Sequence, residues 1–279
     1  MAEITAANVG KLREMTGAGL MDCKKALTEA NGEIDAAVDI LRKKGIATAG
    51  KKGGRAANEG VIVQHVAPGG RLGLLVEINC ETDFVARNDT FKAFCEDVAK
   101  KLAANPSSDL EADRIAAVAK IGENILISRH QRIEVSGNGL VAAYIHTGAK
   151  VGVLVEVGAG KETTVASDDF KQLVRDITLQ IAAAHPSVVT RDQIPADVLA
   201  KEKEIAAEQV KNKPPQAIAK IVEGKLEKFY QGQCLVDQGF VKRNSEITVK
   251  EHIGATAKQL GDEIAIRRFV RFQVGESPA

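Results

Sequence analysis

Two segments decide how this chain folds: Leu72-Gly73-Leu74-Leu75-Val76-Glu77-Ile78 and Val151-Gly152-Val153-Leu154-Val155-Glu156-Val157, which begin 79 residues apart. Each is a short, nearly continuous apolar run, and such runs are typical of β-strands that are buried on both faces. The same pattern at a fixed spacing indicates an internal repeat rather than two unrelated strands. The sequence therefore predicts that one structural module is used twice.

The repeat extends outward from these two strands. Residues 60–92 align without a gap with residues 139–171, and residues 121–135 align with residues 260–274 at a larger shift. Each copy reads as strand, turn, strand, helix, short helix and strand, with Pro68-Gly69-Gly70 as the first turn. Two three-stranded sheets covered by helices give an α+β fold class. We expect core subdomains at residues 60–138 and 139–279.

The second copy is interrupted by about 60 residues that the first copy lacks. Within them, residues 196–211 and 216–230 carry apolar side chains at spacings of three and four, and Pro214-Pro215 separates the two stretches. This pattern predicts an antiparallel helical hairpin, a short coiled coil, at about residues 195–231. It is either a contact arm or an insertion that packs back onto the sheet.

The first 45 residues predict a separate helical domain. Gly17-Ala18-Gly19 and Asn31-Gly32 break the apolar periodicity twice, so we expect three short helices in a UBA-like arrangement that ends at Gly45. Residues 46–59 are dominated by Gly, Ala and Lys and offer little to bury. They are interpreted as a flexible basic linker, for which RNA contact is an alternative to a simple tether.

The corner after the first repeated strand reads Cys80-Glu81-Thr82-Asp83-Phe84-Val85-Ala86. Phe84 could belong to the core, with Asp83 in the first turn of a helix where negative charge is favoured. Alternatively, the acidic group and the ring form an exposed tip for a partner. The second copy has Glu162-Thr163 at the matching positions, so the scaffold does not require an aromatic residue there. Both interpretations remain open at this point.

The composition excludes several classes of protein. Among 279 residues, 38 Lys and Arg balance 37 Asp and Glu, which argues against stable direct binding of nucleic acid. Four scattered cysteines without a CxxC pair fit a reducing compartment and neither a disulfide frame nor a zinc site. No apolar run approaches the roughly 20 residues of a membrane span. The first residues, Met1-Ala2-Glu3-Ile4-Thr5, show no secretory signal, so we expect a cytoplasmic protein.

Catalytic motifs are also missing from the sequence. It contains no Walker-type phosphate loop, no HExxH and no GxSxG pattern. Cys80 lies beside Glu81 and Asp83, and an acidic setting raises a thiol pKa, which argues against a thiol nucleophile. His146 is isolated, and lone histidines are usually structural. We therefore expect neither an enzyme active site nor a cofactor or metal site.

Four segments of the chain resemble the bacterial elongation factor Ts family. The first is Leu12-Arg13-Glu14-Met15-Thr16-Gly17-Ala18-Gly19-Leu20-Met21-Asp22-Cys23-Lys24-Lys25-Ala26-Leu27, and the second is Glu77-Ile78-Asn79-Cys80-Glu81-Thr82-Asp83-Phe84-Val85-Ala86. Residues 119–125 and 269–275 are also similar to this family. The resemblance runs essentially from end to end, and it agrees with the organisation read from the residues.

This resemblance implies a guanine-nucleotide exchange factor that binds elongation factor Tu in its GDP-bound and nucleotide-free states. It implies that Thr82, Asp83, Phe84 and Val85 help to dislodge Mg²⁺ from that GTPase. By the same resemblance, the partner contacts are Arg13, Leu20, Met21, Lys24, Ile121, Gly122 and His146. From the residues alone, Met21 could equally fill the core, and Lys24 could belong to a solvated helix face.

Two further points follow from the resemblance. Many members of the family continue into a C-terminal helical module, whereas this sequence reaches Ala279 shortly after Val274, so contacts from such a module are in doubt. The alternative function is a ribosome- or RNA-associated adaptor without exchange activity, which would use the basic linker and the helical hairpin.

Overall fold

The computed structural model describes residues 4–276, which form two units. Of the described residues, the first unit contains residues 4–63, 76–130 and 273–276, and the second contains residues 64–75 and 131–272. The first three and last three residues, where the predicted domains begin and end, lie outside the described residues. Within residues 4–276, no helix is both long enough and apolar enough to cross a membrane.

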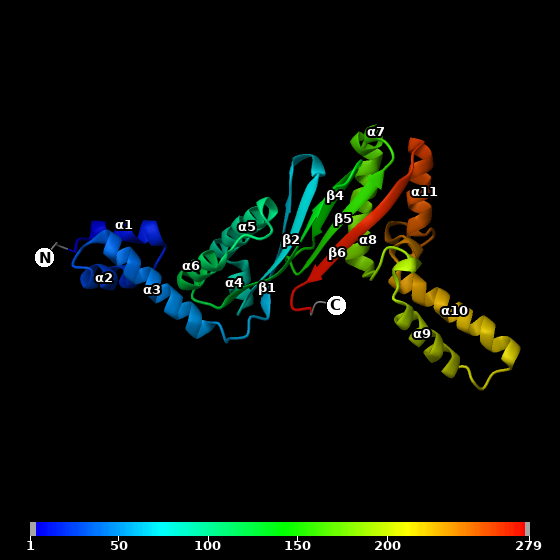
Figure 1. Ribbon diagram of the computed structural model, residues 1–279, viewed down its shortest axis with the longest axis horizontal. Coiled ribbons are helices and arrows are strands. Elements are labelled where there is room, and N and C mark those ends of the chain that lie inside the picture. Colours follow the sequence, from blue (N-terminus) through cyan, green and yellow to red (C-terminus); the bar gives the residue numbers. More distant parts are fainter. Residues whose placement is uncertain (1–3, 277–279) are drawn as a thin grey trace. The chain divides into compact units, whose positions relative to one another are not determined.

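The first unit begins with the three predicted helices, α1 (Ala6–Thr16), α2 (Leu20–Glu29) and α3 (Ile34–Lys52) (Figure 1). Thr5 caps α1, because its hydroxyl accepts a hydrogen bond from the Asn8 amide at 3.2 Å. Gly17, at φ 66°, ends α1 in the left-handed conformation that glycine adopts most easily. Leu12, Cys23 and Leu27 are fully buried where the helices meet.

The predicted end of α3 at Gly45 is wrong. The helix continues to Lys52, so residues 46–52 are not part of a flexible linker, and only residues 53–58 connect α3 with the next strand. The physical reason is contact with another helix. Gly45 is buried, and a Cβ at this position would lie 3.4 Å from the Ala119 Cβ. Small residues in this stretch therefore serve close packing between helices, which sequence periodicity did not reveal.

The first copy of the module has the predicted order of elements. Its sheet is ordered β1 (Glu59–Val66), β2 (Leu72–Cys80) and β3 (Ile125–Glu134), with the 3₁₀ turn η1 (Pro68–Gly70) between β1 and β2. Its helices are α4 (Asp83–Arg87), α5 (Asp89–Ala104) and α6 (Glu111–Ile121). Strand β2 is buried from Gly73 to Cys80, and α5 buries Phe91, Cys95 and Val98. The apolar run thus became a central strand, as expected.

The second copy repeats this order and confirms the α+β fold class. Its sheet is ordered β4 (Gly139–Ile145), β5 (Val151–Ala159) and β6 (Ile264–Gln273), and β4 pairs antiparallel with β5 from Gly139 opposite Gly158 to Ile145 opposite Gly152. Its helices are α7 (Glu162–Ala166), α8 (Asp168–Ala184) and α11 (Val249–Leu260). Phe170 of α8 occupies the same buried place as Phe91 of α5, one repeat further on.

The boundary between the two units differs from the repeat boundary at residues 138 and 139. The turn between β1 and β2 and the last part of β3 belong to the second unit. Close packing explains this assignment for the turn and the start of β2. A Cβ at Gly70 would lie 2.0 Å from the Leu140 side chain, and one at Gly73 would lie 2.4 Å from Val141. A larger residue at either place would require the neighbouring side chains to shift.

The insertion forms a helical hairpin, α9 (Ala196–Glu208) and α10 (Pro215–Gln233), whose helices contact each other (Figure 1). Three 3₁₀ turns complete the insertion: η2 (Arg191–Gln193), η3 (Leu235–Asp237) and η4 (Val241–Arg243). Arg191 fixes the base of the hairpin. Its guanidinium donates to both carboxylate oxygens of Glu227 and of Asp237 at 2.8–2.9 Å and lies 4.4 Å from the centre of the Tyr230 ring.

Candidate functional site

The corner after β2 is held in shape by its own short helix. Thr82 is the N-cap of α4, and its hydroxyl accepts a hydrogen bond from the Val85 amide at 3.3 Å. Ala86 is buried and anchors the helix to the first unit. Phe84 points away from this anchor and is 80% exposed. The interpretation of Phe84 as a core residue is therefore wrong, and the ring is available to a partner.

Asp83 lies beside the exposed ring in the first turn of α4. Its carboxylate pairs with Arg87 at 2.9 Å, and both side chains remain substantially exposed, at 44% and 77%. An exposed pair of this kind contributes only about 0–1 kcal/mol. A partner can therefore displace Arg87 at little cost and meet the carboxylate of Asp83 directly.

Glu123 braces the corner from the loop that follows α6. Its Oε2 accepts hydrogen bonds from the Glu81 and Thr82 amides, each at 3.0 Å. Its Oε1 accepts a third bond from the Thr82 hydroxyl at 2.6 Å. One carboxylate thus satisfies two backbone N–H groups just before the first turn of α4 and fixes the capping side chain itself.

Glu81 makes the reciprocal connection. Its Oε1 accepts a bond from the Asn124 amide at 2.7 Å, and its Oε2 lies 3.5 Å from the Arg55 guanidinium. The bond from Asn124 and the charge of Arg55 together hold the Glu81 pKa below its ordinary value, although desolvation opposes them. The Asn124 side-chain amide also donates to the Arg55 carbonyl at 2.8 Å. Three segments, after α3, after β2 and after α6, are therefore joined at one place.

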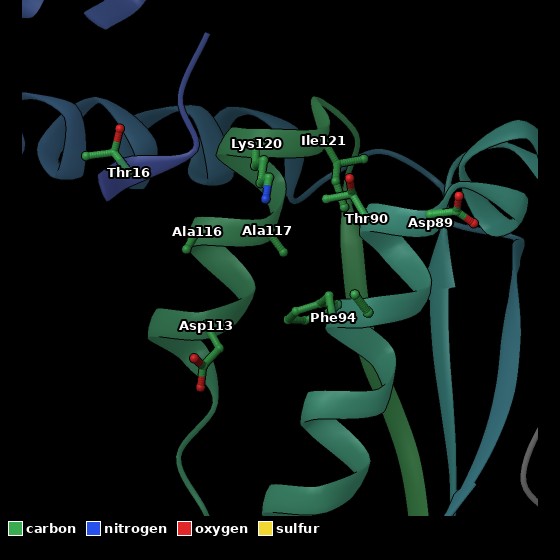
Figure 2. Close-up of a pocket in the computed structure, with 10 residues that line it drawn as sticks. Thr16, Asp89, Thr90, Phe94, Asp113, Ala116, Ala117, Lys120 and Ile121 are labelled. Carbon is green, nitrogen blue, oxygen red and sulfur yellow. The ribbon is translucent and has the colours of Figure 1, made fainter. Parts of the chain in front are cut away.

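Ile121 and Gly122 lie at the start of this same loop. Gly122 ends α6 at φ 87°, a left-handed conformation that explains the glycine by backbone geometry alone. Ile121 is half-buried and lines a pocket of about 550 Å³ between α5 and α6. Figure 2 shows Ile121 and Thr90 at one end of this pocket, Asp113 at the other, and the Phe94 ring pointing from α5 toward α6.

The N-terminal site residues are exposed. Leu20 and Met21 open α2 with exposed fractions of 52% and 62%, and Arg13 and Lys24 are exposed on the neighbouring helix faces. The interpretation of Met21 as core filler is therefore wrong. A Cβ at Gly17, in the turn before α2, would lie 3.1 Å from the Lys120 side chain. The turn between α1 and α2 therefore lies close to Lys120, which is near the end of α6 and directly precedes Ile121.

His146 belongs to the second unit, just after β4, and its side chain is exposed. Its Nδ1 lies 2.9 Å from the Tyr144 hydroxyl. Both residues line a small pocket of about 290 Å³ with Val151, Leu179 and Val241. His146 is thus not a buried structural histidine, and its partner role remains a prediction.

The described residues offer little that resembles a catalytic or metal site. All four cysteines are buried, and the Cys80 thiol donates to the Thr82 carbonyl at 3.2 Å. Burial raises the pKa of Cys234 to about 11 and that of Cys95 further still. Within residues 4–276, no group of three or more His, Cys, Asp or Glu side chains could hold a metal ion.

Sequence reasoning missed Glu123, Glu81 and Asn124 as parts of this site. The signal that could have found Glu123 is the repeat itself, because Gly122-Glu123 aligns with Gly261-Asp262. An acidic residue directly after a helix-ending glycine in both copies indicates a shared structural task. Its target, a backbone corner some 40 residues earlier, is visible only in three dimensions.

Comparison with known proteins agrees with this picture. The family model described as Elongation factor TS matches residues 81–276. A protein named Elongation factor Ts from Nautilia profundicola is 44% identical over 291 aligned residues, which cover 99% of this chain and 94% of that protein. Proteins of the same name from Trichlorobacter lovleyi and Symbiobacterium thermophilum are each 45% identical, cover 98% and 99% of this chain, and are themselves covered to 93%.

Proposed function

The chain belongs to the elongation factor Ts family and is a translation elongation factor, and from this premise we propose that it is the guanine-nucleotide exchange factor of elongation factor Tu. It binds that GTPase with GDP, promotes GDP release, and holds the nucleotide-free form until GTP enters. It acts in the cytoplasm by protein–protein binding and makes no covalent bond.

The observation that carries this proposal is the exposure of Phe84 on a braced corner. Mg²⁺ in a GTPase bridges phosphate oxygens and protein oxygens, so its binding depends on undisturbed geometry. An exposed ring beside a weakly paired carboxylate is suited to enter next to such a site. Phe84 acts as the wedge, Asp83 brings a competing negative charge, and Thr82 and Val85 close the capped turn that supports them.

Exchange then follows from linkage between two ligands of the same GTPase. The factor and GDP weaken each other's binding by the same ratio, because both belong to one thermodynamic cycle. GTP refills the site and releases the factor in turn. No group in the factor needs to donate or accept a proton in this scheme.

The other proposed partner contacts increase the affinity for the GTPase and do not act directly on the rate of GDP release. Leu20 and Met21 supply exposed apolar area, and Arg13 and Lys24 supply positive charge at its edge. An apolar centre with a charged rim is the usual composition of a transient protein interface. Ile121 and Gly122 extend this surface next to the corner, and His146 adds a contact from the second unit.

The test compares the first corner with its counterpart in the second copy. We expect Asp83→Ala with Phe84→Ala to slow the release of a fluorescent GDP from the GTPase in stopped-flow measurements. The matched control is Glu162→Ala with Thr163→Ala, which makes the same kind of change at the corner that lacks the ring. The control should leave the release rate unchanged. Thermal unfolding should change little in either variant, because the residues are exposed.

Equal release rates for the two double variants would contradict the assignment of Asp83 and Phe84. The alternative of an RNA-associated adaptor has lost part of its basis, because residues 46–52 of the expected flexible linker are helical. Strong, salt-dependent RNA binding without any effect on GDP release would revive it.

A further inference from the structure

We propose that Glu123 is a positioning residue for nucleotide exchange, because its carboxylate holds the Asp83–Phe84 corner in the orientation that reaches the metal site of the partner. This inference rests on the proposed function and assigns a role to a residue on the loop that follows α6. Glu123 is not required to touch the partner. It acts through the backbone and the capping side chain of the corner.

The geometry singles out Glu123 among the residues around the corner. Three of its hydrogen bonds, at 2.6–3.0 Å, end on Glu81 and Thr82, directly before the wedge residues. Charge-assisted bonds of this kind are short and directional, so they limit rotation of the first turn of α4. Without them, the N-terminus of α4 would keep only the cap between Thr82 and Val85, and buried Ala86 would remain the anchor of the helix. A five-residue helix has little stability of its own.

The same carboxylate also sets the spacing between two parts of the proposed interface. Glu123 directly follows Ile121 and Gly122, and the reciprocal bond from the Asn124 amide to Glu81 fixes the two segments in both directions. The wedge and the Ile121–Gly122 surface therefore meet the partner as one rigid element. Misplacing a positioned group by about 1 Å can cost a hundredfold in rate.

The second copy of the module allows two roles of the carboxylate to be distinguished: positioning the wedge residues, and capping the backbone of the corner. Asp262, the counterpart of Glu123, accepts a bond from the Lys161 amide at 2.9 Å, as Glu123 does from Thr82. It also accepts a bond from the Thr164 side chain. The brace is thus present at both corners, but only the first corner carries an aromatic ring. The chain itself provides a control in which a similar carboxylate brace, sharing the bond to the corner amide, serves no wedge.

The experiment measures the maximal rate of GDP release from elongation factor Tu at saturating factor, with Mg²⁺ and with excess EDTA. For Glu123→Ala we expect a loss of about tenfold to a hundredfold with Mg²⁺. In EDTA we expect a rate within about twofold of the wild type, because no metal ion then remains to be displaced. Asp262→Ala, the matched control, should equal the wild type under both conditions.

Stability is compared in parallel by thermal unfolding, and similar midpoints for Glu123→Ala and Asp262→Ala would show that both variants lose equivalent caps. If Glu123→Ala does not fold, Glu123→Gln keeps the side-chain volume and one acceptor oxygen. It should then give a smaller loss of the same Mg²⁺-dependent kind.

Three outcomes would overturn the inference. Wild-type release rates for the Glu123 variants in Mg²⁺ would show that the corner is positioned without this side chain. An equal loss in Mg²⁺ and in EDTA would show that Glu123 supports docking in general. If the wild-type chain itself fails to accelerate GDP release, the proposed function falls, and the inference falls with it.

Discussion

Glu81 illustrates how one residue can carry both a local and a long-range task. Its amide donates to Glu123, and its carboxylate accepts from Asn124, so two loops are closed by a pair of crossed bonds. The bond from Asn124 is the main reason why the Glu81 pKa is lowered. A carboxyl group with a lowered folded-state pKa stabilises the fold above its ordinary pKa and loses this contribution as the pH falls through the folded value.

We therefore expect the corner to loosen in acid. As the pH is lowered below 4.5, the ordinary pKa of the Glu81 carboxyl, the Asn124 amide should lose protection against hydrogen exchange relative to amides in β2. Glu81→Gln removes the titrating group, so its Asn124 amide should show weak protection that no longer depends on pH in this range. Protection of Asn124 in the wild type that is constant from pH 6 to pH 3 would contradict this role of Glu81.

The sequence predicted the wedge residues better than their support. Comparison of the two copies left the core and exposed interpretations of Phe84 open, because Thr163 takes its place in the second copy, and the structure shows that the ring is exposed. The brace by Glu123 could not be read in the same way. Its three bonds join residues separated by about 40 positions, and no local pattern reports such a distance.

At the scale of elements, α3 shows that a helix can continue through residues that lack the apolar periodicity of a helix. Beyond Gly45 the helix continues through Ile46-Ala47-Thr48-Ala49-Gly50, where apolar side chains do not form a wide stripe. Its stability here comes from close contact with α6, at Gly45 opposite Ala119, and from burial of Ala49. Most helical stability in proteins comes from such tertiary packing, so a reading based on local residues ended the helix too early.

Substitutions at Gly45 should separate helix propensity from packing. A Cβ at Gly45 meets Ala119 at 3.4 Å and Ile115 at 3.8 Å, so Gly45→Ala should fit and stabilise the chain by up to about 1 kcal/mol through helix propensity. Gly45→Leu should overpack the contact and destabilise by about 1–3 kcal/mol. Urea denaturation measures both free energies of unfolding. A free energy of unfolding that does not fall in Gly45→Leu would contradict close packing between α3 and α6.

At the scale of the whole molecule, the repeat and its interruption were predictable, because residues of the first copy align with residues of the second copy on both sides of the insertion. The α+β class, the order of elements and the position of the hairpin all follow from that alignment, and the structure confirms them. The limits of the two units were not predictable. They depend on contacts such as Gly70 with Leu140, which join residues from different copies.

The hairpin of α9 and α10 should be dispensable for folding. Among the residues whose burial the structure describes, the hydrophobic core cluster of the second unit contains none from α9 or α10, and the buried Ala206 and Val210 lie near the tip of the hairpin. We expect that a short Gly/Ser linker in place of residues 201–222 shifts the thermal unfolding midpoint by less than about 3 °C. Arg191 and its partners stay in this variant. A fall of more than about 10 °C would instead indicate that the arm packs onto the sheet.

The end of β6 has a consequence for how this protein is made. Gln273 accepts a hydrogen bond from Arg129, and the Gly275 amide donates to the carboxylate of Glu77, at 2.9 Å in both cases, so these late residues complete the first unit. A ribosome exposes Glu77 and Arg129 long before it releases residue 275. The earlier parts of the first unit therefore lack these two hydrogen bonds in the nascent polypeptide until residues 273–275 have been synthesised.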